Sequence, residues 1–267
     1  MNTQLTDYIL HLADNTLVLG QRNSEWCGHG PVLEQDIAIT NISLDLVGQA
    51  RNLYQYAANL INGSNSSPGG GGREGASEDS LAYLRDTRDF KNLLITEQPN
   101  GDWGQTILRQ FFFSTYQYLL YERLQQCADA TLAAITEKSL KEVTYHVRWS
   151  SEWVIRLGDG TKESHKRILQ AIDELWTFTG EMFISAGYEL KVAEQGNGVD
   201  VSLLKEDWQN RINQVLFEAT LISSPGSNGR EKVWMQTGGK DGKHTEHLGF
   251  ILAELQFMQR AYPGSEW

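Results

Sequence analysis

Four long stretches of this chain repeat apolar residues at alternating steps of three and four, and none of them contains a proline. That spacing places the apolar side chains on one face of an α-helix, which a proline inside the helix would break. The pattern therefore predicts long helices over residues 3–26, 33–61, 103–126 and 131–157. Helices of this length are typical of antiparallel bundles, and no segment alternates as a half-buried strand would. We predict an all-α fold.

Shorter helices are expected between and after the four long ones, at residues 78–85, 87–96, 162–185, 203–222 and 245–261. The segment 63–77 contains six glycines and no aliphatic or aromatic residue larger than alanine, so we expect a flexible loop there. We predict a single domain over residues 1–267, in which an antiparallel four-helix bundle core is extended by C-terminal helices.

The composition excludes several classes of protein. The chain carries 23 Lys and Arg against 34 Asp and Glu, a net charge of −11, which argues against binding to nucleic acid or to an anionic membrane. No apolar run reaches the ~18 residues of a membrane span, and residues 1–15 lack the pattern of a signal peptide. Two cysteines, Cys27 and Cys127, do not make a disulfide framework. We predict a cytoplasmic protein with no nucleic-acid or membrane partner.

Polar residues interrupt the apolar face of each long helix near its middle, the depth at which ferritin-like proteins hold a di-iron centre. They are Thr16, Asp45, Ser114 with Tyr118, and Glu142 with His146. Such a centre needs a Glu from each of two helices and a Glu-x-x-His motif from each of the other two. None of the six histidines follows a glutamate by three residues, so the helices are poor in metal donors. We favour a buried polar pair, Glu142 with His146, over a working metal site.

Glu142 is expected to face the interior of the bundle, where a carboxylate is costly unless a donor or a cation meets it. Two candidate partners are His146, one turn further along the same helix, and Arg51 from the second long helix. Removing Glu142 is therefore expected to affect stability and not metal content.

The segment 242–249 contains His244, Glu246 and His247, which are weak candidates for zinc ligands. A zinc site needs a further protein ligand and a defined geometry. The alternative is that Thr245 caps a helix and that Glu246 lies in its first turn, where an acidic side chain is favoured by the helix dipole.

Two more motifs carry weak signals. The glycine and lysine residues of 238–243 resemble a phosphate cradle, but the GK[ST] of a P-loop is missing. Cys27 and His29 lie near a helix end, where packing and capping account for them more simply than chemistry does.

Four segments of unusual sequence follow one another along nearly the whole chain. They are 25–57, which begins EWCGHGPVLEQD, 92–103 (NLLITEQPNGDW), 141–161, which begins KEVTYHVRW, and 237–264, which begins TGGKDGKHTEHLG. Together they resemble the C-subunit family of bacterial phenylacetyl-CoA epoxidases, the PaaC family. The main departure is SNSSPGGGGREG (64–75), which looks like an expanded loop.

The resemblance implies a ferritin-like bundle and a structural role in aerobic phenylacetate degradation. In that family the di-iron centre lies in the A subunit, which epoxidises the ring of phenylacetyl-CoA with O2 and electrons from a reductase subunit. The C subunit shares the fold, pairs with the A subunit in a complex with small accessory and reductase subunits, and lacks the metal ligands. No catalytic or cofactor-binding residue is then expected here, and Asp45, Glu142 and His146 stand at ligand-like positions. The alternatives are a self-sufficient di-iron or di-manganese oxidase and a subunit that binds the CoA thioester.

Overall fold

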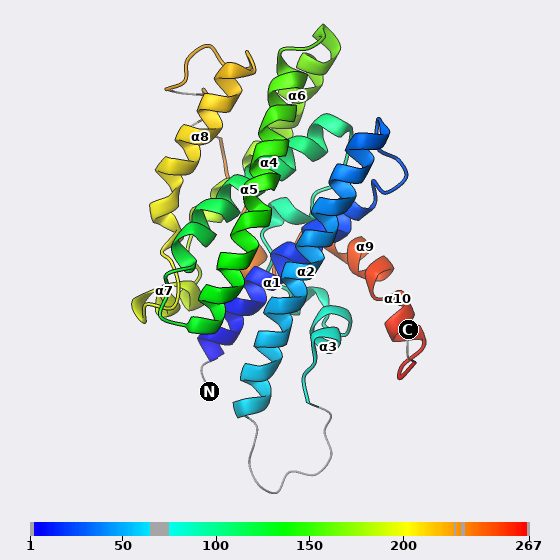
Figure 1. Cartoon of the computed structure of the whole chain (residues 1–267), viewed down its shortest axis with the longest axis vertical. Coiled ribbons are helices and arrows are strands. Elements are labelled where there is room, and N and C mark those ends of the chain that lie inside the picture. The colour runs from blue at the N-terminus through cyan, green and yellow to red at the C-terminus, as the bar shows by residue number, and fades with distance from the viewer. Residues whose placement is uncertain (1–2, 65–74, 227, 231–232, 266–267) are drawn as a thin grey trace, which may run out of the picture.

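The computed structural model describes residues 3–64, 75–226, 228–230 and 233–265, and every regular element in these ranges is a helix. The four long helices are α1 (Thr3–Ser24), α2 (Leu33–Ser64), α4 (Trp103–Leu124) and α5 (Ala130–Gly158). α1 packs along α2, α4 packs along α5, and α2 also contacts α5 (Figure 1). The all-α prediction is confirmed, and the four predicted helices end within a few residues of the observed ones.

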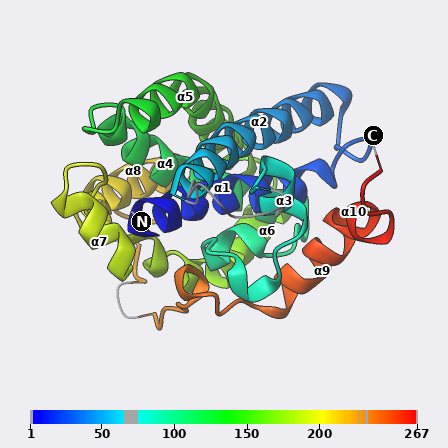
Figure 2. The ribbon, with the colours of Figure 1, turned by 90° about the horizontal axis from the view of Figure 1, so that it is seen from below.

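α1 lies at the centre of the molecule, and α2, α7 (Gly187–Glu194) and α9 (Glu246–Leu255) pack against it (Figure 2). Residues 8–20 are all buried, whereas the spacing predicts only one buried face. A helix that is covered on all sides must find partners for its polar side chains inside the protein. Asp14, Asn15 and Asn23 of α1 therefore bond to segments that are distant in sequence.

The remaining helices are short. They are α3 (Glu78–Tyr83), η1 (Thr87–Asp89), η2 (Leu94–Glu97), α6 (Lys162–Leu175), η3 (Trp176–Phe178), η4 (Gly180–Phe183), α7 (Gly187–Glu194), η5 (Val201–Leu204), α8 (Lys205–Glu218), η6 (Gly239–Asp241), α9 (Glu246–Leu255) and α10 (Phe257–Ala261). The sequence did not predict α7 as a separate helix, and the predicted helix 245–261 is interrupted at Gln256.

Two predicted helices are wrong in part. Residues 87–96 form two 3-10 turns joined by an irregular stretch, because Leu93, Leu94 and Ile95 are all buried and a helix with one covered face does not bury three consecutive residues. The predicted helix 162–185 ends as an α-helix at Leu175. Beyond it Trp176 and Phe183 are buried against other aromatic rings, so packing overrides helical propensity.

A cluster of tryptophans joins the start of α2 to α4 and α5. The indole of Trp103 lies edge-on to Trp26, Trp149 and Trp153, at centroid distances of 5.1, 6.0 and 5.9 Å. Gln35 of α2 accepts hydrogen bonds from the indole nitrogens of Trp149 and Trp153, at 3.0 and 2.7 Å. These contacts fix where α2 begins.

No helix in the described ranges is long and apolar enough to cross a membrane. Of the segment predicted to be a flexible loop, 63–77, residues 65–74 lie outside the described part of the chain. Its two flanks are joined by Asn62, which donates to the carbonyl of Ala76 at 2.8 Å and accepts from its amide at 2.9 Å.

Candidate functional site

Four polar side chains at mid-height of the long helices form one hydrogen-bonded chain, the mid-helix relay. Gln49 of α2 donates to Glu142 of α5 at 2.9 Å, and Gln117 of α4 donates to Gln49 at 3.0 Å. Gln117 also lies 3.2 Å from the hydroxyl of Tyr121, whose pKa burial raises to about 12. The relay crosses from α5 through α2 to α4, and only Glu142 is partly exposed.

A second contact between α2 and α5 lies one turn away from the relay. Nε2 of His146 is 3.0 Å from Oδ2 of Asp45, and the ring of His146 is fully buried. Asp45 and Gln49 are four residues apart on α2, and His146 and Glu142 are four apart on α5. The two contacts are therefore successive rungs between antiparallel helices.

These rungs correct the predicted pairing of Glu142. Its partner is Gln49, because the antiparallel register turns His146 toward Asp45 instead. Arg51 points away from the relay. Its guanidinium lies 3.7 Å from Glu78, and its side chain is 70% exposed.

The remaining mid-helix residues bond locally. Thr16 donates to the carbonyl of Ala13 at 2.9 Å, and Ser114 donates to the carbonyl of Gln110 at 2.7 Å. Tyr118 does not face the other long helices as predicted. Arg211 of α8 lies 4.8 Å from the centre of its ring, because α8 packs against α4 on that side.

The donor chemistry at this depth does not fit a di-iron centre. Amides stand at Gln49 and Gln117, and their NH2 groups donate hydrogen bonds where a metal needs carboxylate oxygens or imidazole nitrogens. In the described ranges no three His, Cys, Asp or Glu side chains come close enough together to hold a metal ion. The two carboxylates present, Asp45 and Glu142, are each engaged by a side chain of the neighbouring helix.

A second polar region holds the C-terminal part of the chain to the core. Nδ1 of His244 is 2.9 Å from Oε2 of Glu97, and Nε2 is 2.9 Å from the carbonyl oxygen of Phe90. Both partners accept, so both ring nitrogens carry a proton. Burial would lower the pKa of His244, but the hydrogen bond and the charge of Glu97 outweigh it and raise the pKa. His244 has no lone pair left for zinc.

Thr245 bonds to the same carboxylate group, that of Glu97. Its amide and its hydroxyl donate to Oε1 of Glu97, at 2.6 and 2.7 Å. Thr245 precedes α9 as predicted, with Glu246 in the first turn, but its hydroxyl does not cap the helix. The predicted zinc candidates are thus parts of a helix start, and His247 lies half-buried on it.

The glycine loop before His244 holds a carboxylate of the protein itself. The amides of Gly238 and Gly239 both donate to Oε1 of Glu181 at 2.7 Å, and the amide of Leu94 donates to Oε2 at 2.8 Å. A Cβ on Gly239 would lie 2.2 Å from the carbonyl oxygen of Asn92, so only glycine fits. The loop has the donors of an anion cradle, and Glu181 occupies them.

Lys240 completes this region. Its Nζ donates to Glu189 at 2.8 Å and to the carbonyl of Ile184 at 2.9 Å, and both side chains of the ion pair are buried. We call the donors the C-terminal clamp: Gly238, Gly239, Lys240, His244 and Thr245. Its three carboxylate acceptors are Glu97, Glu181 and Glu189. The glycine and lysine residues of 238–243 and the histidine and threonine that follow therefore bond to carboxylates of the protein itself.

The comparison with known families agrees with the resemblance. A family model described as "Phenylacetic acid catabolic protein" matches residues 1–267. The chain belongs to this family. The C subunit of the 1,2-phenylacetyl-CoA epoxidase of Escherichia coli (strain K12) is 46% identical to it over 264 residues, which cover 99% of either chain.

In this family member the segment around Cys27 is a capped turn. Both oxygens of Asp36 accept backbone amides, from Gly28 and Gly30, each at 3.1 Å. These two hydrogen bonds lower the pKa of Asp36. Nδ1 of His29 lies 3.1 Å from the carbonyl oxygen of Cys27, so the ring caps the turn and does not activate the thiol.

Sequence reasoning missed several residues of both regions. Gln49 lies three residues after Leu46 on the apolar face of its helix, so its register alone could have identified it as buried. Glu97 closely follows the apolar residues Leu93, Leu94 and Ile95, which is a weaker indication that its side chain is buried. Glu181 carries no local signal, because its partners Gly238, Gly239 and Leu94 lie more than 50 residues away. Glu189 accepts from the nearby amide of Ala186 at 2.7 Å, but that local contact does not indicate its ion pair with Lys240, 51 residues further on.

Proposed function

We propose that this family member is the non-catalytic, structural subunit of a phenylacetyl-CoA epoxidase in aerobic phenylacetate degradation. It would have a ferritin-like four-helix core and bind the homologous di-iron catalytic subunit, which works with small accessory and reductase subunits. The observation that carries the proposal is the mid-helix relay. At the depth where a di-iron centre needs carboxylate and imidazole ligands, the side chains are amides, and the carboxylates that are present already accept hydrogen bonds. The 46% sequence identity with the C subunit of a 1,2-phenylacetyl-CoA epoxidase supports a role in phenylacetate degradation.

The outer side of α2 supports the binding of a partner chain. Leu33, Ile37, Leu44 and Val47 are 73, 51, 65 and 43% exposed and follow one another at steps of four, seven and three. We call them the outer row of α2. The opposite side of the same helix is buried through Ile39, Ile42 and Leu46. An exposed apolar row on a helix whose opposite side is already buried is typical of a surface that binds another protein. Apolar residues at steps of three, four and seven can pack against a helix of that partner.

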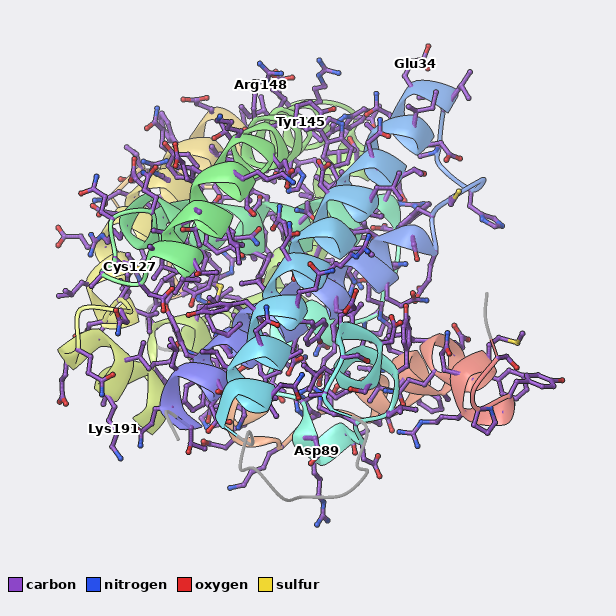
Figure 3. The ribbon with its side chains drawn as sticks, turned by 60° about the horizontal axis from the view of Figure 1, so that its bottom comes forward. Glu34, Asp89, Cys127, Tyr145, Arg148 and Lys191 are labelled. Carbon is purple, nitrogen blue, oxygen red and sulfur yellow. The ribbon has the colours of Figure 1, made fainter. Side chains whose placement is uncertain are left out.

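The outer side of the neighbouring helix α5 has a different character. Lys141, Arg148 and Glu152 are exposed there, and Figure 3 shows Arg148 reaching outward beside Tyr145. Charged residues are depleted at the centre of protein interfaces. This difference favours the outer row of α2 as the surface that binds the partner.

Co-expression with the catalytic subunit of the same epoxidase tests the proposal. We expect the two chains to co-elute in size-exclusion chromatography, with iron bound to the catalytic chain and little in this chain purified alone. Equilibrium dialysis of the isolated chain against phenylacetyl-CoA is expected to show no binding. Separate elution at micromolar concentration would overturn the pairing. Near-stoichiometric iron in the isolated chain would favour the oxidase alternative.

A matched pair of variants tests the surface. Leu44→Asp places a charge in the outer row and should weaken partner binding about tenfold or more, or about 1.4 kcal/mol. Leu203→Asp is the control, because Leu203 is 63% exposed against 65% for Leu44 and lies on η5. Equal losses from both variants would show that the partner binds elsewhere.

A further inference from the structure

Gly48 lies in the middle of α2, where the packing of this chain gives no reason for a glycine. A glycine inside a helix destabilises it relative to alanine, so its presence calls for a reason in packing. Gly20 of α1 has one, because a Cβ there would lie 3.2 Å from Cγ2 of Val47, where α1 packs against α2. A Cβ built on Gly48 meets no atom within 4 Å in the described part of the chain outside its own helix backbone. Gly48 is exposed, so this open space lies at the surface.

Gly48 continues the outer row of α2. It lies four residues after Leu44, and Arg51 lies three residues after Gly48, so all three share the exposed side of the helix. The row carries large apolar side chains at Leu33, Ile37 and Leu44 and no side chain at Gly48. Two helices approach most closely where the side chains between them are smallest. A helix that lies on this row would therefore come nearest to α2 at Gly48.

A hollow of about 210 Å³ opens beside this glycine. It lies between α2 and α3, which pack against each other (Figure 1), and Val47 of the outer row forms part of its wall. Leu17, Ala50 and Ala82 line it further in, and all three are buried. Cavities of ~150 Å³ take up benzene, so this hollow has room for one large side chain of a protein that lies on the row.

The rim of the hollow carries an acidic side chain that has no partner. Glu78 accepts from Gln55 at 3.0 Å and lies 3.7 Å from Arg51, so its charge is met. Asp79 is exposed, and among the described residues no hydrogen bond or ion pair reaches its carboxylate. Burial raises the pKa of Tyr83, and the charge of Asp79 raises it further. A long basic side chain suits this hollow, because its aliphatic stem can cover the apolar walls while its charged end meets Asp79.

We propose that a helix of the catalytic subunit crosses α2 at Gly48 and places a lysine or arginine side chain in the hollow. This inference rests on the proposed function, because it takes the partner of that function as the occupant. The outer row, Gly48 and the hollow adjoin one another, so a single helix can contact all three. The hollow carries two carboxylates, Glu78 and Asp79, against one guanidinium, which disfavours an anionic ligand such as a CoA tail.

Substitutions at Gly48 test the crossing point. Gly48→Leu should weaken binding of the purified catalytic subunit about tenfold or more in isothermal titration calorimetry, because the new side chain holds the two helices apart. Gly249→Leu is the control and should leave binding unchanged, since Gly249 of α9 is a helical glycine with equally open space. Equal losses from both variants, or no loss from Gly48→Leu, would overturn the crossing point.

Gly48→Ala separates the needs of the fold from those of the partner. In this chain alone it should raise the melting temperature by about 2 °C, because alanine favours a helix and its methyl group meets no other side chain. The same variant should bind the catalytic subunit more weakly than the wild type. A fall in the melting temperature would show that the fold itself needs the glycine and would overturn the inference.

Asp79→Asn tests the basic side chain of the partner. Loss of the charge should weaken binding about two- to fivefold, and the difference from the wild type should shrink at high salt. Glu206→Gln is the control, because Glu206 is an exposed acidic residue in the first turn of α8, as Asp79 is in the first turn of α3. Unchanged binding in Asp79→Asn, or an equal loss in both variants, would overturn this part of the proposal.

Binding of the wild type distinguishes a failure of the proposed function from a failure of this inference. If the wild type does not bind the catalytic subunit, both fail. If it binds, and Leu44→Asp weakens the complex while Gly48→Leu does not, only the crossing at Gly48 is overturned. Sedimentation velocity of this chain alone should show the 30.1 kDa monomer. A dimer that Gly48→Leu dissociates would assign the surface to a second copy and overturn the inference.

Discussion

The mid-helix relay and the C-terminal clamp are both buried polar regions, but they are built from different groups. The relay joins neutral amides, a tyrosine and one half-exposed carboxylate between neighbouring long helices. The clamp joins three buried carboxylates to a protonated imidazole, an ammonium group and backbone amides. Burying a charged side chain costs much free energy unless an opposite charge or several hydrogen-bond donors lie next to it. Burying a neutral amide costs less, even when one of its atoms has no hydrogen-bond partner.

The clamp restricts which residues can stand in it more than the relay does. Each clamp carboxylate needs a partner of particular chemistry and, at Gly239, a residue without a Cβ. The relay and its neighbouring rung retain two buried polar atoms without a hydrogen-bond partner, Oε1 of Gln117 and Nδ1 of His146, and the clamp retains one, Oε1 of Glu189, which lies 3.7 Å from Nε2 of His11. We therefore expect the clamp to carry more of the free energy of unfolding than the relay. The first three of the four predictions below test this ranking, and the fourth concerns a segment outside both regions.

The largest effect is expected from Glu97→Ala. It removes the acceptor of His244, Thr245 and Asn92 and leaves a buried charge unpaired. We expect the free energy of unfolding to fall by about 3–5 kcal/mol, measured by urea denaturation. Glu97→Gln is the control and should lose less, because it keeps the shape and one acceptor. A loss below that of Glu142→Ala would reverse the ranking.

His244→Gln is expected to cost about 1.5–3 kcal/mol, and the cost should depend on pH. The pKa of His244 is raised in the folded chain above its ordinary 6.5. The stabilisation that protonated His244 provides is therefore fully present below pH 6.5. It is lost as the pH rises through the pKa that His244 has in the folded chain. His11 has a lowered pKa because it is buried, so its effect on the pH dependence of stability is opposite to that of His244. That effect is the same in the wild type and in His244→Gln, so it cancels when the two are compared.

Melting curves of wild type and His244→Gln, recorded from about pH 6 to about pH 9, measure that dependence. The gap between the two melting temperatures should be widest at the acidic end and narrow toward the alkaline end. A gap that does not change with pH would show that the imidazole is held neutral.

Glu142→Ala should cost about 1 kcal/mol or less, because Glu142 is half-exposed and accepts one hydrogen bond from an amide. This is far below the cost expected for a buried ion pair with His146. A Glu142→Ala/His146→Ala double-mutant cycle should show little coupling, since the two residues bond to different partners. Loss of bound iron in Glu142→Ala would revive the metal-site alternative.

The smallest effect is expected from shortening the segment between Asn62 and Ala76. These flanks already hold each other through two hydrogen bonds, and the free energy of loop closure changes slowly with length. Deletion of residues 66–73 should move the melting temperature little and leave partner binding unchanged. A large loss of either would mean that the segment contacts the rest of the protein.

The sequence predicts the long helices well because their signal is local. Leu5, Ile9 and Leu12 recur at helical spacing, and Asp102, directly before α4, caps it by accepting from the amide of Gln105 at 2.9 Å. The site is predicted less well. Asp45 and His146 can be recognised as interior positions, but the register that pairs them, and that pairs Glu142 with Gln49, depends on how two helices slide past each other.

The clamp could not be predicted in this way. Glu97 and His244 are 147 residues apart, and neither segment indicates that it contacts the other. Only the folded chain brings η2 and the start of α9 together. The glycines of the loop signal an anion cradle, but they do not show that Glu181 fills it.

The tryptophan cluster at the start of α2 has an optical consequence. Three indoles whose centroids lie 5.1 to 6.0 Å from that of Trp103 exchange excitation energy with it, so their near-ultraviolet dichroism and emission depend strongly on mutual orientation. Gln35, which bonds two of them, lies between Leu33 and Ile37 of the outer row. A chain that docks on this row would change the signal without any added dye, so the protein carries its own fluorescent reporter of association.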